Sequence, residues 1–217
     1  MQDNRMKIQP PSPALKRGRR HMVGYVGVMG RQEGIDLLLE AARILIQEQG
    51  RDDIQFGLVG GGTSLEEMKV LASELGIADH VTFTGRVPDA EMLAMLNTAD
   101  VCVNPDVANE MNDKSTMNKI MEYMALAKPI VQFDLAEGRF SAGEASLYAK
   151  KNDPRSMAQK IAELLDDPAR RAAMGEFGRR RVENELEWRY EVPKLLAAYS
   201  TVFATKIRTV PSAQSGD

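Results

Sequence analysis

Short apolar runs alternate with longer amphipathic stretches along most of this chain, and this alternation limits the folds open to it. The runs at 54–59 and 129–133 are largely apolar rather than alternating, which is typical of strands covered by helices on both faces. The pattern predicts an α/β fold with a doubly wound, mostly parallel sheet. Strands are expected at 22–27, 54–59, 80–84, 100–104, 129–133 and 145–149. Helices are expected at 33–49, 64–75, 89–97, 154–165, 168–185 and 188–205.

A further helix is predicted ahead of the fifth apolar run, with Asn112 or Asp113 as its N-cap and Pro129 opening the next strand. At about 100° per residue its faces separate by polarity. The polar face carries Ser115, Asn118, Lys119 and Glu122, and the apolar face carries Met117, Ile120, Met121 and Met124.

The start of that helix is a candidate anion site, because free backbone N–H groups there accompany the Ser115–Thr116 pair. Glu122 lies roughly 10 Å from Ser115 at 1.5 Å rise per residue. That separation suits a ligand with phosphate at one end and a diol such as ribose at the other. An ordinary amphipathic helix with an exposed polar face explains the same pattern equally well.

Ligands of doubly wound sheets bind beyond the carboxyl ends of the strands. Three of these ends carry glycines, so backbone can approach a ligand closely there. The candidate contacts are Gly27, Val28, Gly30 and Arg31 after the first strand, Gly60 and Gly61 after the second, and Arg86 and Val87 after the third. The chain has neither a Gly-x-Gly-x-x-Gly motif after the first strand nor a P-loop motif, which disfavours dehydrogenases and P-loop NTPases.

Charge and composition exclude several other classes. Residues 1–20 hold six basic residues against one acidic residue, so with a total of −3 the remaining chain carries −8. A body that acidic argues against a nucleic-acid surface. Two histidines and a single cysteine, Cys102 within an apolar run, make a zinc site, a disulfide framework and a catalytic cysteine improbable.

The ends of the chain differ in composition from its body. The Pro-rich, basic residues 1–20 are interpreted as an interdomain linker remnant or a disordered segment, and 206–217 as a disordered tail. Residues 21–205 form the expected single domain. Without a membrane-length apolar run the expected location is the cytoplasm, and membrane contact is expected only peripherally, through the basic cluster at 16–20.

Five motifs in order give the chain a family resemblance over about residues 21–205. They are GVMGRQEGID at 27–36, LVGGG at 58–62, VTFTGRV at 81–87, ADVCVNP at 99–105 and MEYMALAKPIV at 121–131. This succession resembles the nucleotide-sugar-binding half of group 1, retaining, GT-B-type glycosyltransferases, the glycogen-synthase-like superfamily.

The resemblance implies a nucleoside-diphosphate sugar as donor and an N-terminal acceptor-binding half in the same protein. It implies no metal and no cofactor, and it assigns no catalytic residue to this half. By position, Glu122 would hold the ribose hydroxyls and the 85–87 loop would read the base. Ser115 and Thr116 would approach the diphosphate, above the loop from Gly27 to Gly30.

The sequence departs from the family pattern at three positions. Lys114 stands where the first Glu of the paired-Glu motif belongs, Val28 where an Arg is usual, and Glu33 where a Lys is usual. Arg31 and Lys114 are candidates to replace the two missing cations. A non-catalytic nucleotide-sugar-binding or interaction module with a degenerate glycosyltransferase fold would show the same losses, and it is the alternative function.

Overall fold

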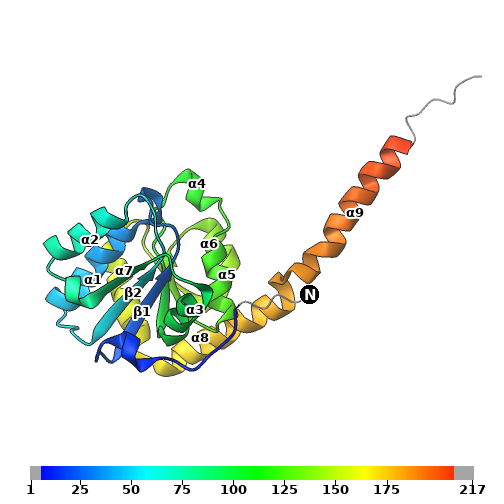
Figure 1. Ribbon diagram of the computed structural model, residues 1–217. Helices are drawn as coiled ribbons and strands as arrows, with labels where there is room; N and C mark the ends of the chain where they lie inside the picture. The colour runs from blue at the N-terminus through cyan, green and yellow to red at the C-terminus, as the bar shows by residue number, and fades with distance from the viewer. Residues whose placement is uncertain (1–5, 208–217) are drawn as a thin grey trace, which may run out of the picture.

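The computed structural model describes residues 6–207, with side chains described up to residue 204. Six parallel strands form one sheet in the order β3-β2-β1-β4-β5-β6, which confirms the predicted doubly wound α/β fold (Figure 1). The strands are β1 (His21–Val26), β2 (Ile54–Val59), β3 (Val81–Gly85), β4 (Val101–Asn104), β5 (Ile130–Phe133) and β6 (Ser146–Ala149).

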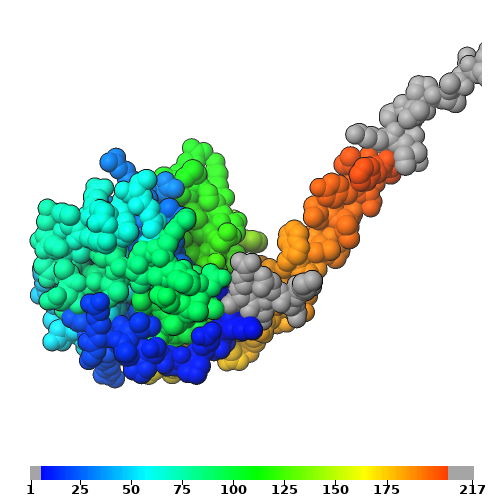
Figure 2. All heavy atoms as spheres, in the orientation of Figure 1, coloured from blue at the N-terminus to red at the C-terminus, as the bar shows by residue number. Residues whose placement is uncertain are grey.

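Helices cover both faces of this sheet, as the largely apolar strands predict. One layer contains α1 (Ile35–Arg43), α2 (Leu65–Glu74) and α7 (Pro154–Asp166). The other contains α3 (Asp89–Thr98), α5 (Asn118–Ala125) and α8 (Pro168–Arg181). The described chain ends in α9 (Trp188–Ile207), which extends away from the body of the domain (Figure 2). No described helix is long and apolar enough to span a membrane.

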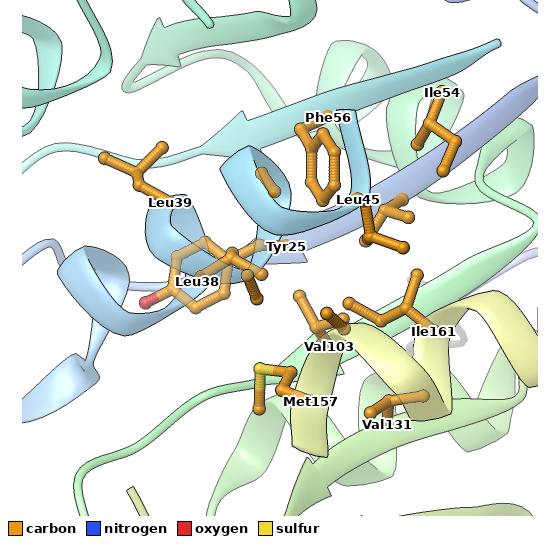
Figure 3. Packing of buried hydrophobic residues seen from close by; sticks show 14 of the residues in the cluster. Tyr25, Leu38, Leu39, Leu45, Ile54, Phe56, Val103, Val131, Met157 and Ile161 are labelled. Atoms are coloured by element: carbon orange, nitrogen blue, oxygen red, sulfur yellow. The ribbon is translucent and has the colours of Figure 1, made fainter. Parts of the chain in front are cut away.

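The larger of the two packed layers lies between the sheet, α1 and α7. Tyr25 and Phe56 from the sheet meet Leu38 from α1, Leu45 from the π-helical turn that follows it and Ile161 from α7, all almost fully buried (Figure 3). Cys102 is buried on the opposite face, as expected for a thiol in an apolar strand, and burial raises its pKa to about 12.

Several elements differ from the predicted ranges. The helix expected at 33–49 is divided into the short 3₁₀ helix η2 (Arg31–Glu33), α1 and a π-helical turn η3 (Ile44–Glu48). Gly34 separates η2 from α1 with a left-handed φ of 62°. The structure also contains α6 (Ala136–Ala142), which was not predicted. Gly138 lies in its middle, where glycine lowers helix propensity.

The predicted start of the helix at residues 112–113 is wrong. A separate one-turn helix, α4 (Glu110–Asp113), is capped by Asn109, and α5 begins only at Asn118. Both predicted caps have other partners. The Asn112 amide donates to the carbonyls of Gln32 and Val107, and the Asp113 carboxylate accepts from the Ala136 backbone N–H.

The N-terminal segment lies against the amino-end edge of the sheet. The Ser12 backbone N–H donates to the Thr98 hydroxyl over 2.8 Å, and Lys16, in the 3₁₀ helix η1 (Pro13–Lys16), pairs with Asp100 over 2.7 Å. Arg19 donates to the Gln55 side chain. The interpretation of residues 1–20 as a linker stays a prediction. Residues 1–5 of that segment and 208–217 of the expected tail lie outside the described residues.

Strands β1 and β4 diverge toward their carboxyl ends. They pair only through Val23 with Val101 and Gly24 with Cys102. Beyond that point the Tyr123 hydroxyl bridges the strands, accepting from the Val26 N–H over 2.9 Å and donating to the Val103 carbonyl over 3.2 Å. The strand order reverses between β1 and β4, so the two strands diverge at the place where ligands of such sheets bind.

We expect Tyr123→Phe to lower the free energy of unfolding by about 1–3 kcal/mol, because a buried N–H and a buried carbonyl lose their shared partner. Urea denaturation measures the change. Tyr199→Phe, at an exposed site on α9, is the matched control and should stay within about 0.5 kcal/mol of the wild type. Equal stability of the two variants would contradict the bridging role.

Candidate functional site

Two glycine-bearing loops pack on each other at the carboxyl edge of the sheet. The backbone N–H of Met29, in the 27–30 loop, donates to the Gly61 carbonyl over 2.9 Å. A Cβ on Gly60 would lie 1.9 Å from the Gly27 carbonyl oxygen, and one on Gly62 would lie 2.4 Å from that of Met29. Loop-to-loop packing therefore explains Gly60 and Gly62 without a ligand. Gly30, by contrast, has open space where a side chain would be.

A second contact joins the η2 turn to the loop that follows β4. The Val107 N–H donates to the Gln32 carbonyl over 2.9 Å, beside the bond from the Asn112 amide. A Cβ on Gly34 would lie 2.0 Å from the Pro105 carbonyl oxygen, so a larger residue does not fit there. These contacts hold the turn at 31–34 and the loop at 105–109 next to the α5 helix, and we call these two segments the rim loops.

The Lys119 ammonium lies at the centre of a buried charge cluster. It is 2.5 Å from a Glu33 carboxylate oxygen and 3.0 Å from one of Asp106. It also lies 5.1 Å from the centre of the Tyr25 ring, whose hydroxyl hydrogen-bonds to Glu33 over 3.0 Å. The cluster joins β1, η2, the loop after β4 and the first turn of α5.

Burial and the surrounding charges shift two pKa values in this cluster. Burial raises the pKa of Asp106 to about 6; the nearby Lys119 ammonium opposes the shift and the Glu33 carboxylate adds to it. The pKa of Tyr25 is raised well above its ordinary value by burial and by Glu33. Asp106 therefore takes up a proton at a higher pH than an aspartate in water does.

Helical periodicity places Lys119 on the polar face of its helix, but in the structure this residue is buried, which contradicts the alternative of an exposed polar face at this position. The helical wheel counts Lys as polar, but here its stem is buried and its ammonium has partners from two loops. One sequence feature could have indicated that Lys119 is buried. Position 33 carries Glu where the family resemblance leads us to expect Lys, and a carboxylate that becomes buried needs a cation nearby. Spacing along the chain, however, does not show that this cation is Lys119.

Glu122 lies one turn beyond Lys119 on α5. Its carboxylate is half-buried and has no hydrogen bond or ion pair with any described residue. Burial raises the pKa of Glu122, and the Lys119 ammonium partly offsets that shift. An acceptor of this kind, partly desolvated and unpaired within residues 6–207, is suited to binding hydroxyl groups of a ligand.

Ser115 and Thr116 precede α5 instead of opening it. The Ser115 hydroxyl donates to the Met111 carbonyl over 2.7 Å, and the Thr116 hydroxyl donates to Glu137 over 2.7 Å. Met117 occupies the N-cap position without a side-chain cap bond, and Asn118 is the first helical residue, with an exposed side chain. The open helix start is therefore at 117–119, about one turn later than predicted.

The two candidate replacement cations occupy different surroundings. Lys114 follows α4 as its C-cap, its side chain is 72% exposed, and it pairs with Glu110 over 2.8 Å. The predicted N-cap at Asn112 or Asp113 would put Lys114 in the first turn of the helix, but Lys114 lies before α5, which begins at Asn118. Arg31 lies exposed in η2 and has no ion pair with a described residue.

The loop after β3 reaches the same edge of the sheet. The Gly60 N–H donates to the Gly85 carbonyl over 2.9 Å, and Gly85 has a left-handed φ of 67°. Arg86 is exposed beside Gly61, while Val87 is half-buried.

Four buried polar atoms near the ends of β4 and β5 have no hydrogen-bond partner among the residues that the structure describes. They are the two amide atoms of Asn104, one Asp106 oxygen and the Gln132 carbonyl oxygen. Asn104 and Gln132 are register partners on adjacent strands. Buried polar groups of this kind need a hydrogen-bonding group from outside the chain, most often ordered water. No group of three or more His, Cys, Asp or Glu residues in the described part of the chain is arranged to hold a metal ion.

Comparison with known proteins relates this arrangement to one family. The family model described as "Glycosyl transferases group 1" matches residues 20–167. The D-inositol 3-phosphate glycosyltransferase of Thermobispora bispora is 30% identical over 92% of this chain and 49% of that protein. The 2-deoxystreptamine glucosyltransferase of Streptomyces kanamyceticus is 27% identical over 83% of this chain and 46% of that protein.

Solved structures agree in fold. Sucrose-phosphate synthase from Thermosynechococcus elongatus matches with a TM-score of 0.73 and 24% identity, over 92% of this chain and 51% of that one. Anabaena Alr3699/HepE, solved in complex with UDP, matches with a TM-score of 0.75 and 16% identity, over 93% of this chain and 53% of that one. The chain spans about half the length of the relatives it matches.

The raised pKa of Asp106 predicts a specific pH dependence of stability. The folded pKa of about 6 exceeds the ordinary value near 3.9, so the folded state favours the neutral acid and loses stability as pH rises from about 4 to above 6. Asp106→Asn stays neutral. Relative to this variant, the wild type should therefore lose on the order of 2 kcal/mol between pH 4 and pH 7.

Urea denaturation of both proteins across that pH range measures the difference, with Asp79→Asn, at an exposed site, as the control. A difference between wild type and Asp106→Asn that does not change with pH would show that Asp106 ionises in the fold as it does in solution.

Proposed function

This chain belongs to the group 1 glycosyltransferases, and from that premise we propose that it is the donor-binding domain of a retaining, GT-B-type enzyme. The parent protein would transfer a hexose-like sugar from a nucleoside-diphosphate sugar to an acceptor. The observation that carries the proposal is the unpaired, half-buried carboxylate of Glu122 beside the rim loops of the sheet. Relatives described as GDP-mannose-dependent mannosyltransferases, and the UDP complex of a similar structure, support this donor class.

Glu122 is proposed to accept hydrogen bonds from the two ribose hydroxyls. A carboxylate presents two acceptor oxygens, and a vicinal diol presents two donors at matching separation. Partial burial keeps water from competing for the same oxygens, which makes these charge-assisted bonds stronger than on an open surface. The base would then lie toward the loop of Gly85, Arg86 and Val87, whose backbone groups can read its edge.

The diphosphate is proposed to lie between the 27–30 loop and the start of α5, near Ser115, Thr116 and Asn118. Open backbone N–H groups at 117–119 and the helix dipole favour an anion there. Lys119 is a buried cation in the first turn of this helix, and Arg31 and Lys114 are exposed cations in η2 and after α4. Together these groups would stabilise the leaving diphosphate without a metal ion.

The acceptor is proposed to bind a second, N-terminal half of the parent protein. The matched length, about half of each relative, supports this reading. So does α9, which carries exposed Leu196, Tyr199 and Phe203 on a helix that extends from the domain (Figure 2). Exposed apolar patches of this kind usually mark a surface that packs on another domain.

The alternative is a non-catalytic module that binds a nucleotide sugar or a partner protein. One observation favours it: Glu33 neutralises Lys119, so the buried cation already has a carboxylate where the donor phosphate would need it. Titration of the domain with UDP, GDP and ADP shows whether it binds a nucleoside diphosphate. An activity assay of the full-length parent protein shows whether the domain belongs to an enzyme or to a non-catalytic module.

We expect Glu122→Ala to weaken binding of the cognate nucleoside diphosphate by about 1.5–3 kcal/mol, because charge-assisted hydrogen bonds to the ribose are lost. Calorimetric titration of the folded variant measures the loss. Glu91→Ala, at an exposed site on α3, is the control and should bind as the wild type does. Unchanged affinity in Glu122→Ala would remove the ribose role from this residue.

Charge changes around the diphosphate should affect the diphosphate more than the bare nucleoside, which lacks the anionic group. Lys114→Ala and Arg31→Ala should each weaken the diphosphate about two- to fivefold, as expected for exposed ion pairs. Glu33→Gln should tighten it, because Lys119 loses the carboxylate that competes with phosphate.

Paired titrations with nucleoside and nucleoside diphosphate measure these effects, with Lys160→Ala on α7 as the control for a lost surface cation. Equal effects on both ligands, or none in any variant, would refute a diphosphate site at this cluster and favour the degenerate module.

A further inference from the structure

A cavity of about 550 Å³ lies between α1 and α2, on the helix layer that faces away from α5 and Glu122. Its floor is apolar: Ile35 and Met68 are buried, and Leu71 is half-buried beside them. Gly30 lines its edge, so the cavity adjoins the 27–30 loop without including Glu122 or Lys119. Its volume is within the range of small-molecule sites.

Three carboxylates line the cavity without a partner in the described part of the chain. Asp36 from α1 and Glu67 and Glu74 from α2 make neither ion pairs nor side-chain hydrogen bonds with any described residue. Glu66, next to Glu67 but outside the cavity, is paired with Lys69 over 2.8 Å. With Arg31 as the single lining cation, the cavity carries a net charge of −2, because three negative groups face one positive group.

Ser64 adds a neutral polar group at the apolar floor. The residue is 6% exposed, lines the cavity, and precedes α2 without making a cap bond. Its hydroxyl has no hydrogen-bond partner among the described residues. The hydroxyl oxygen is not among the fully buried atoms that lack a partner, so it is open to the cavity, where a polar group of a ligand can take the place of water as its hydrogen-bond partner.

We propose that this cavity is a binding site for a small primary amine with an apolar body. The apolar part would cover Ile35, Met68 and Leu71, since its burial removes hydrocarbon surface from water. The ammonium would lie among Asp36, Glu67 and Glu74, with Ser64 as a further acceptor. An anion is disfavoured by the net charge, and a purely apolar ligand would leave Ser64 and the carboxylates without partners.

Glu67 and Glu74 are seven residues apart on α2 and therefore lie on one face, about two helical turns from each other. A single ammonium would contact one of them closely and be attracted by the other at longer range. Both contributions are electrostatic and partly exposed, so they should weaken with salt.

The test titrates 2-phenylethylamine and its neutral analogue 2-phenylethanol into the full 217-residue chain, followed by NMR chemical shifts and by calorimetry. The amine should bind at least fivefold more tightly than the alcohol and shift resonances of α1 and α2. Glu67→Gln combined with Glu74→Gln should weaken the amine about five- to tenfold and leave the alcohol unchanged. Glu66→Gln, the neighbouring carboxylate outside the cavity, should change amine affinity less than twofold.

Circular dichroism and thermal melting confirm that each variant is folded, and these carboxylates are on the surface, so folding is not expected to depend on them. Equal affinity for amine and alcohol would overturn the proposal and leave an apolar groove only. So would an equal loss in Glu66→Gln, which would indicate non-specific attraction, or no binding of either probe. Nucleoside-diphosphate affinity is measured in the same samples, because its loss would concern the donor site and not this cavity.

Discussion

The buried ammonium of Lys119 joins segments that are far apart along the chain. Glu33 comes from the turn after β1, Asp106 from the loop after β4, and Lys119 from the first turn of α5. Each carboxylate by itself would be costly to bury, and the ammonium makes both tolerable. The carboxyl edge of the sheet is therefore organised around one positive charge, and the rim loops take their positions relative to it.

Backbone packing supplies the rest of this arrangement. Gly34 fits only because no side chain intervenes between it and the Pro105 carbonyl, and Gly60 approaches Gly27 in the same way. The Tyr123 hydroxyl bridges β1 and β4 where their ladder ends. Rigid contacts therefore surround the place where β1 and β4 diverge and the strand order reverses. Such rigidity suits a site that must hold a ligand in one orientation.

If the start of α5 binds the donor diphosphate as proposed, the charge cluster also relates stability to ligand binding. A phosphate brought to the start of α5 would compete with Glu33 for Lys119, and a proton on Asp106 would reduce the negative charge that opposes it. Position 33, where the family resemblance leads us to expect a lysine, carries a carboxylate, and the buried positive charge comes instead from Lys119 on α5.

Residue order alone determined the fold class, because the alternation of largely apolar strands with amphipathic helices has few solutions other than a doubly wound parallel sheet. It also located the glycine-bearing strand ends and Glu122 on a helix. The tertiary structure decided the strand order, the start of α5 and the burial of Lys119. Helical periodicity places a lysine on the polar face by its charge, but whether that charge is solvated depends on Glu33 and Asp106, which approach only after folding. Local sequence likewise predicts Asn112 or Asp113 as a helix cap. In the structure the Asn112 side chain bonds to the carbonyls of Gln32 and Val107, and the Asp113 side chain bonds to the first residue of α6. These contacts join segments far apart along the chain, so local spacing cannot predict them.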